Sequence, residues 1–413
     1  MQVRDISRIK YEPLLVQANH WLAAAKRLED MDALASELAW KSLEQYVHPH
    51  LRQHLSICVK KLVNKGEAMQ QRLQNGTATE FEIERFKRSY LQVETLMDFY
   101  ADALATRTNP AVTATLKACD YIAEHSMRML LEPLGHTTPA VITYIDKGMG
   151  ASILKAGLRL WDDSENPAAA IKIVRHNLLR PTALIHEAGH QVAHITGWNE
   201  QLAAALRHAL LKHGAELADS WAAWSSEIAA DIFAFVHTGF ASVAALHDVV
   251  DGPSRGVLHY SSGDPHPISY LRVLVGTECC KHCFGNGVWD HMRRNWMRRH
   301  PLENARPATA KLIRASLPLL PEIVKVLLDY PLRAFRNKSI RQQIDVNAVH
   351  PASLQSTADL YGTSFYTSAP LLLKAPLLRL AWNGYQLIAA PEQAERFQDQ
   401  QRSWMQLLGN SIK

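Results

Sequence analysis

One five-residue run restricts the possible folds of this 413-residue chain more than any other feature: His186-Glu187-Ala188-Gly189-His190. On a helix, residues four apart lie on one face, so His186 and His190 can direct both imidazoles at a single ion. Glu187 lies beside them, where a carboxylate can take a proton from water and later deliver it. Two histidines and a glutamate at this spacing are typical of zinc peptidases. The run therefore predicts one Zn2+ ion held by His186 and His190, with Glu187 as the general base.

The sequence around this run predicts a strand followed by a helix. Residues 168–174 are mostly apolar and are expected to form a buried strand. The helix is expected to begin at Pro181, a residue suited to the first helical position, and to end at Gly197, a residue suited to a C-terminal cap. A strand at a sheet edge beside the ion can hold an extended peptide by main-chain hydrogen bonds.

Two histidines leave a catalytic zinc ion one protein ligand short, and the third is expected from a later helix. Glu227, on a helix predicted over 216–237, is the candidate. Asp231 follows one turn later and can accept a hydrogen bond from a ligating imidazole, which would fix the imidazole tautomer. The alternative is that both acids face solvent. His194 is expected to be a core or supporting histidine, because it lies about 80° round the helix from His186 at ~100° per residue.

Three motifs follow one another over residues 186–272. They read H-E-A-G-H at 186–190, E-I-A-A-D at 227–231 and H-P-I-S-Y-L-R at 266–272. In this order they resemble the gluzincin zinc metallopeptidases of the CAAX prenyl protease and HtpX type. The resemblance implies a zincin-like metallopeptidase core, one zinc ion and hydrolysis of peptide bonds. It implies no prenylated substrate, because the chain has no stretch near the ~20 apolar residues of a membrane span.

The resemblance also implies roles for two residues of the last motif. His266 would lie in the cleft and stabilise the oxyanion, and Arg272 would pair with Asp231. The family often has two prolines after this histidine, whereas here only Pro267 follows. On chemical grounds, a tetrahedral intermediate needs a donor opposite the zinc ion, and Tyr260 is the second candidate after His266.

The composition indicates a soluble cytoplasmic protein, and the resemblance implies a protein or peptide as its substrate. Lys and Arg number 45 and Asp and Glu number 40, an excess of +5 that is too small and too dispersed to indicate a nucleic-acid partner. The first residues carry charges and lack the apolar core of a signal peptide. Five cysteines imply no disulfide framework, which fits a reducing compartment. Three of them lie at 279–283 without a second matching pair, so packing is expected there instead of a structural zinc site.

We expect an α+β, predominantly α-helical fold with three domains: an N-terminal helical domain (1–132), a gluzincin-like zinc peptidase domain (133–300) and a C-terminal helical region (301–413). A small sheet would contain strands 140–145 and 168–174, flanked by helices. The N-terminal domain is expected either to pack against the catalytic unit or to bind a regulator or partner. Apolar residues at three- and four-residue spacing predict further helices at 11–28, 31–46, 51–65, 79–106, 109–131, 152–160, 199–212, 308–317, 321–328, 354–361, 370–387 and 391–408.

These observations predict a zinc metalloendopeptidase and leave two alternatives open. One alternative keeps the metal but hydrolyses a non-peptide amide. The other is a catalytically latent or degenerate peptidase fold that serves as a regulatory or binding module. Glu187 argues against the second alternative, because a binding module has no need of a general base.

Overall fold

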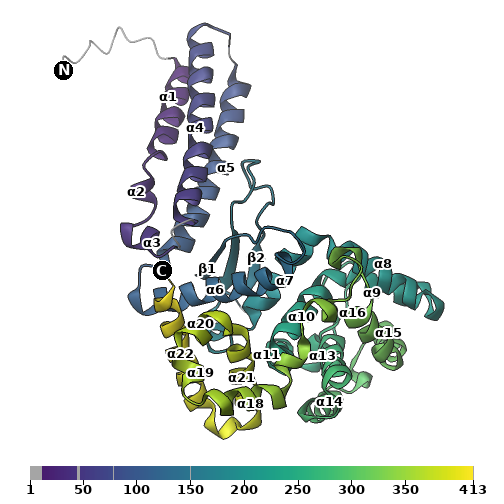
Figure 1. Ribbon diagram of the computed structural model, residues 1–413. Coiled ribbons are helices and arrows are strands. Elements are labelled where there is room, and N and C mark those ends of the chain that lie inside the picture. Colours follow the sequence, from purple (N-terminus) through teal and green to yellow (C-terminus); the bar gives the residue numbers. More distant parts are fainter. Residues whose placement is uncertain (1–11, 44–46, 78, 149, 413) are drawn as a thin grey trace. The chain divides into compact units, whose positions relative to one another are not determined.

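The computed structural model describes residues 12–43, 47–77, 79–148 and 150–412 (Figure 1). Within these ranges the chain is predominantly helical with one three-stranded sheet, which confirms the expected α+β class. The chain divides into two compact units, 1–113 with 156–168, and 114–155 with 169–413. The second unit therefore takes in most of the expected peptidase domain together with the expected C-terminal region.

The first unit is a helical bundle. Apolar side chains recur every three or four residues along its longest helix, and this stripe forms the buried face. The segment 156–168 joins the bundle through Asn166, whose Oδ1 accepts a hydrogen bond from the buried Tyr100 hydroxyl at 2.5 Å. Long helices that pack side by side form the bundle (Figure 1): α1 (Pro13–Arg27), α4 (Val47–Gln74) and α5 (Glu80–Ala105).

Two short helices, α2 (Met31–Leu34) and α3 (Glu37–Lys41), replace the single helix expected over 31–46. The break occurs because Ala35 is extended, with φ −153° and ψ 151°. Ser36 then caps α3 by accepting a hydrogen bond from a backbone N–H. Residue 11 and residues 44–46 of the expected helices lie outside the described residues.

The sheet of the second unit has the strand order β1-β3-β2. β1 (Val141–Ile145) pairs in parallel with β3 (Ala169–Ile173). β2 (Ser152–Leu154) pairs antiparallel with the other side of β3, so that Ile153 lies opposite Ile171. β2 is therefore an edge strand, with one row of main-chain groups directed away from the sheet.

The helix expected over 152–160 is wrong. Residues 152–154 form β2, because pairing with a strand distant in the sequence prevails over the local apolar spacing. Gly157 has φ +77°, a left-handed conformation that does not continue a right-handed helix. Arg159 and Glu165 then form an antiparallel bridge across the turn.

The closest helix pair of the second unit is α7 (Ala183–Thr196) and α10 (Ser225–Thr238) (Figure 1). Gly189 of α7 makes the close approach possible. A Cβ atom at this position would lie 2.9 Å from Ala230 Cα and 2.9 Å from Phe233 Cβ. A side chain larger than hydrogen would therefore force the two helices apart.

The helix expected over 216–237 is two helices in the structure. α9 (Ala215–Ala223) ends at Trp224, whose φ and ψ of −86° and 2° leave helical geometry. The Trp224 indole is buried edge-on against Trp221, with ring centres 5.5 Å apart. Because α10 starts anew after the break, Glu227 lies in its first turn, where the helix dipole stabilises a carboxylate.

Other helices surround the α7–α10 pair. Three of them pack directly on α10: α11 (Phe240–Val250), α13 (Ser269–Phe284) and α21 (Pro376–Ala389). The helix expected over 370–387 is interrupted at Ala375. Ala375 precedes Pro376, and the helical conformation is sterically disfavoured for a residue before proline.

Within the described ranges, no helix has both the length and the apolar character needed to cross a membrane. The remaining helices and 3-10 turns have these bounds: α6 (Pro110–Leu131), η2 (Arg175–Leu179), α8 (Trp198–Leu210), η3 (Leu211–His213), α12 (Ser254–Val257), α14 (Val288–Arg299), η4 (Leu302–Asn304), α15 (Pro307–Ser316), η5 (Leu317–Leu319), α16 (Leu320–Asp329), η6 (Arg333–Phe335), α17 (Ile340–Gln343), η7 (Val346–Val349), α18 (Pro351–Tyr361), α19 (Ser364–Thr367), α20 (Ala369–Lys374), η8 (Pro391–Gln393) and α22 (Ala394–Ser411).

Candidate metal centre and active site

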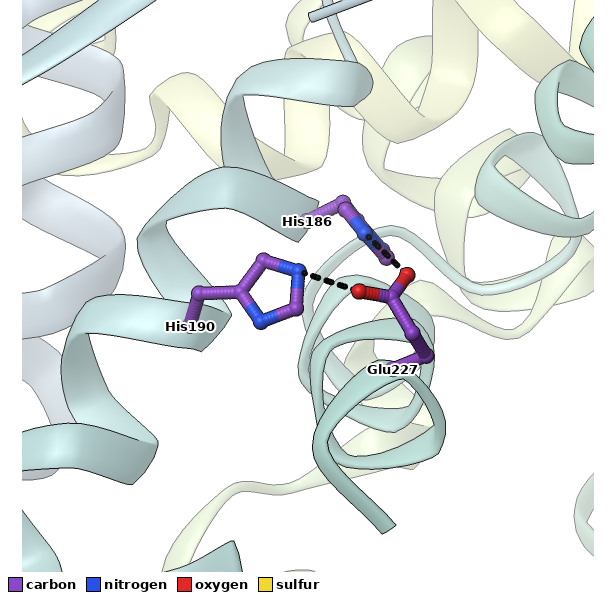
Figure 2. A group of neighbouring side chains, drawn as sticks. All are labelled: His186, His190 and Glu227. Carbon is purple, nitrogen blue, oxygen red and sulfur yellow. Dashed lines mark ion pairs between the residues drawn. The ribbon is translucent and has the colours of Figure 1, made fainter. Parts of the chain in front are cut away.

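Three expected ligand residues meet between α7 and α10. Figure 2 shows the imidazoles of His186 and His190 directed from one helix toward the Glu227 carboxylate on the other. His186 Nε2 lies 3.5 Å and His190 Nε2 lies 3.2 Å from an oxygen of Glu227. One ligand atom from each residue lies within 4.8 Å of the other two. Ligand atoms around a tetrahedral zinc ion at ~2.1 Å are roughly 3.4 Å apart, a spacing that the two contacts to Glu227 match, and the group as a whole could hold a metal ion.

A chain of hydrogen bonds orients His186. Its Nδ1 lies 2.9 Å from Asp231 Oδ1, which leaves Nε2 directed at the centre of the group. Arg272, on α13, donates from Nε and Nη2 to the two oxygens of Asp231, at 2.8 Å each. Arg272 Nη2 also lies 3.5 Å from Glu227. The structure thus joins the acidic residue of the second motif to the arginine of the third.

Two residues that the sequence did not indicate support His190. The Ser226 hydroxyl lies 3.5 Å from His190 Nδ1, and Asn199 Nδ2 donates to that hydroxyl at 3.4 Å. Ser226 immediately precedes Glu227 in the first turn of α10. Its position next to a proposed metal ligand is the one sequence feature that could have indicated its role. Each histidine therefore has a polar neighbour at its Nδ1 atom, on the side opposite Nε2.

Glu187 is buried with 7% of its surface exposed, and it lines the same cavity as His186, His190 and Glu227. Burial raises its pKa, although the neighbouring imidazoles of His186 and His190 act in the opposite direction. Lys155, just after β2, also lines this cavity, and burial lowers its pKa. A buried carboxylate beside two imidazoles is suited to accept and return a proton.

Ionisable side chains of opposite charge face one another in this group. Glu187, Glu227 and Asp231 provide three carboxylates, and Arg272, Lys155 and a protonated His186 provide three positive charges. Burial opposes ionisation of Glu227, but hydrogen bonds with His186 and His190 hold its pKa far below the usual range. Burial likewise opposes a charge on His186, yet its bonds to Asp231 and Glu227 raise its pKa to about 10. The donor set of two imidazoles and one carboxylate fits a divalent metal ion, which would supply positive charge at this point.

The structure separates the two candidates for oxyanion stabilisation. His266 lies at the cavity, with Nε2 3.8 Å from Glu227 and Nδ1 2.8 Å from Asp264. Tyr260 instead packs edge-on against Trp224 at 6.0 Å between ring centres and is not among the residues that line the cavity. His266 is 61% exposed at its side chain, so it can move toward a bound ligand.

Three other expectations have definite outcomes. His194 is exposed at the end of α7, so the expectation of a core or supporting histidine is wrong. The packing prediction for the cysteines at 279–283 agrees with the burial of Cys279 and Cys280. Within the described part of the chain, the group of His186, His190 and Glu227 has metal-binding geometry, and the cysteines do not. The solvent-facing alternative for Glu227 is excluded by its 9% exposure.

A cavity of about 750 Å³ lies in the second unit, and His186, His190 and Glu227 form part of its wall. Ser152 and Ile153 of the edge strand β2 form part of its wall. Side chains of α10, α11 and α13 form an inner, mainly apolar part of the wall: Ile232, Phe235, Val243, Leu246, Val249 and Val275. An extended peptide paired with β2 would therefore pass His186, His190 and Glu227. One of its apolar side chains could enter the apolar part of the cavity.

Comparison with protein-family models, with curated proteins and with solved structures finds no match to this chain.

Proposed function

We propose that the protein is a zinc-dependent metalloendopeptidase of the gluzincin type, with a zincin-like core in the second unit. The observation that carries the proposal is the juxtaposition of His186, His190 and Glu227 with the buried Glu187 at one cavity. A histidine–histidine–glutamate set with a second, unligated glutamate is the arrangement found in zinc peptidases. The hydrogen bonds among Asp231, His186 and Arg272 support it, because a metal-ligating histidine needs a fixed tautomer.

In this proposal the residues of the chain divide the work as follows. Zinc, when bound, would supply Lewis acidity that polarises the scissile carbonyl and lowers the pKa of water. Glu187 accepts the proton of the attacking water and delivers it to the leaving amine. His266 donates a hydrogen bond to the oxyanion, and the main chain of β2 aligns the peptide by strand pairing. We further propose a cytoplasmic location, because all five cysteines are free thiols.

The test compares new protein N-termini in cells that produce wild type, Glu187→Gln or Glu216→Gln. Glu216 is an exposed glutamate on α9, so its replacement controls for the loss of one carboxylate. We expect shared new termini with wild type and Glu216→Gln, none with Glu187→Gln, and the same zinc content in all three purified proteins. Identical termini in all three cultures would contradict the proposal and favour a binding module. Hydrolysis of small amides without any new termini would favour an amidase.

A further inference from the structure

A buried arginine in the C-terminal part of the second unit has no hydrogen-bond acceptor. Arg379, on α21, has 1% of its surface exposed. None of its three guanidinium nitrogens has a hydrogen-bond partner among the described residues. A guanidinium carries five N–H donors, and burying that charge without acceptors is strongly unfavourable. Something with acceptor atoms is therefore needed at this position.

Aromatic rings satisfy only part of this requirement. The Arg379 guanidinium carbon lies 3.4 Å from the ring centre of Tyr366 and 5.7 Å and 5.8 Å from those of Phe365 and Trp404. Such contacts stabilise a cation over the faces of rings. The N–H donors, however, point outward in the plane of the guanidinium, so stacking leaves them without acceptors.

Further buried polar atoms without partners lie on α21 and on the helix that packs against it. Asn383 follows Arg379 by one turn on α21, and Gln401 and Trp404 share a buried face of α22, which packs on α21. Trp404 Nε1, both amide atoms of Gln401 and Asn383 Oδ1 are buried without a partner in the part of the chain that the structure describes. Gln400 Oε1 is a further buried oxygen without a partner there. Because N–H donors and a positive charge predominate over these three amide oxygens, an anion with oxygen acceptors would satisfy most of the group.

We propose that Arg379, the indole N–H of Trp404 and the amide of Gln401 form a binding site for an oxyanion, a carboxylate or a phosphate group. The planar fork of Arg379 matches two oxygens of such a group. Trp404 and Gln401 contribute additional N–H donors from a second helix. The site is separate from the His186–His190–Glu227 group, and the inference does not depend on the proposed peptidase activity.

An open cavity of about 980 Å³ adjoins the rings that cover Arg379, and Arg379 itself is not part of its wall. Tyr366 and Trp404, which flank the guanidinium, also form part of the cavity wall. Tyr366 is half-buried, and its hydroxyl donates a single hydrogen bond to Gln386 at 3.3 Å. Rotation of Tyr366 would therefore connect the cavity with Arg379. The cavity wall has three acids: Asp399 is paired with Arg402 at 2.7 Å, Asp359 accepts a hydrogen bond from Gln355 at 2.7 Å, and Glu395 is exposed.

The test measures thermal unfolding of the full chain in inorganic phosphate, in acetate and in chloride at matched ionic strength and pH. Wild type is compared with Arg379→Met, which keeps a side chain of similar length without the charge, and with Arg402→Met, an exposed arginine of the same region. We expect phosphate or acetate to raise the unfolding temperature of wild type and Arg402→Met saturably, by about 5 °C at a hundredfold excess over Kd. Arg379→Met should show no such increase, and the anion that acts identifies the ligand class.

Equal shifts in all three proteins, or no saturable shift of wild type with either anion, would overturn the proposal. If no anion stabilises wild type and Arg379→Met is less stable than wild type, Arg379 has a purely structural stacking role. If Arg379→Met does not fold, calorimetric titration of wild type with phosphate and with acetate decides the question. One saturable site that increases amide protection over 394–411 supports the proposal, and the absence of binding with both anions refutes it.

Discussion

Arg272 binds both carboxylate oxygens of Asp231, from Nε and Nη2 at 2.8 Å each. Asp231 in turn lies 2.9 Å from His186 Nδ1. The side chain of Arg272 is 10% exposed, so this pair is largely shielded from water. The pair connects α13 to α10 and, through His186, to α7, and it explains why a buried aspartate is tolerated beside two other carboxylates.

Replacement of Arg272 by lysine should weaken metal binding. Lysine keeps the charge but cannot form the two parallel hydrogen bonds that hold Asp231. Because Asp231 orients His186, we expect the zinc affinity to fall about 10- to 100-fold. Competition with a chelating dye measures this affinity. Arg299→Lys is the control, since the side chain of Arg299 is 63% exposed and pairs with Asp251 at 3.0 Å. Unchanged affinity in Arg272→Lys would mean that Asp231 does not position His186.

Glu227→Ala should purify with far less zinc than wild type, because it removes one of the three proposed ligands. Elemental analysis of the purified protein gives the zinc content. Glu216→Ala, an exposed change on the preceding helix, should retain full occupancy. Glu187→Gln should also retain zinc, because this side chain is proposed to move a proton and not to bind the ion. Full occupancy of Glu227→Ala would remove Glu227 from the site.

Gly189→Ala should destabilise the protein, against the usual preference of helices for alanine. Intrinsic propensity favours alanine by ~1 kcal/mol, whereas overpacking a closed contact costs about 1–3 kcal/mol. The added Cβ would lie 2.9 Å from Ala230 Cα, a backbone atom that cannot rotate away. We expect the free energy of unfolding to fall by about 1 kcal/mol net.

Chemical denaturation of the metal-free protein measures the effect of Gly189→Ala. Gly252→Ala is the matched control, because its added Cβ would meet nothing within 4 Å. If Gly189→Ala is as stable as wild type, α7 and α10 are separated more widely than the structure indicates.

Acid should destabilise the second unit through two histidines, His125 and His237. Burial lowers the pKa of His125 to about 4 and that of His237 to about 3. In the unfolded chain both titrate near ~6.5, so the unfolded state binds protons first as the pH falls. The stability is therefore complete above about pH 6.5 and decreases below it. At about pH 4.5 each histidine should cost about 2–3 kcal/mol.

Urea denaturation between about pH 7 and 4.5 tests the histidine prediction. His237→Gln should reduce the slope of stability against pH by the contribution of one group. His208→Gln should leave the slope unchanged, because His208 is exposed on α8. Equal slopes for His237→Gln and wild type would show that His237 is protonated or accessible in the folded protein.

Local sequence patterns predicted the features that a single helix determines. His186 and His190 were expected on one face of one helix, and α7 presents them so, because four residues complete about one turn. Most helix positions followed from apolar spacing for the same reason. Where pairing is not local, the patterns failed, as for 152–160: β2 exists only because β3 lies alongside it.

The completed site depends on packing that no local pattern encodes. Glu227 lies close to the histidines because Gly189 has no side chain, which allows α10 to pack directly on α7. The Ser226 neighbour of His190 and the unpaired Arg379 were not predicted, since a serine or an arginine on a helix has no periodic signature of burial. Sequence spacing thus determined which side chains share a helix face. Tertiary structure alone decided which faces meet, because interhelical distances depend on the packing of side chains far apart in the chain.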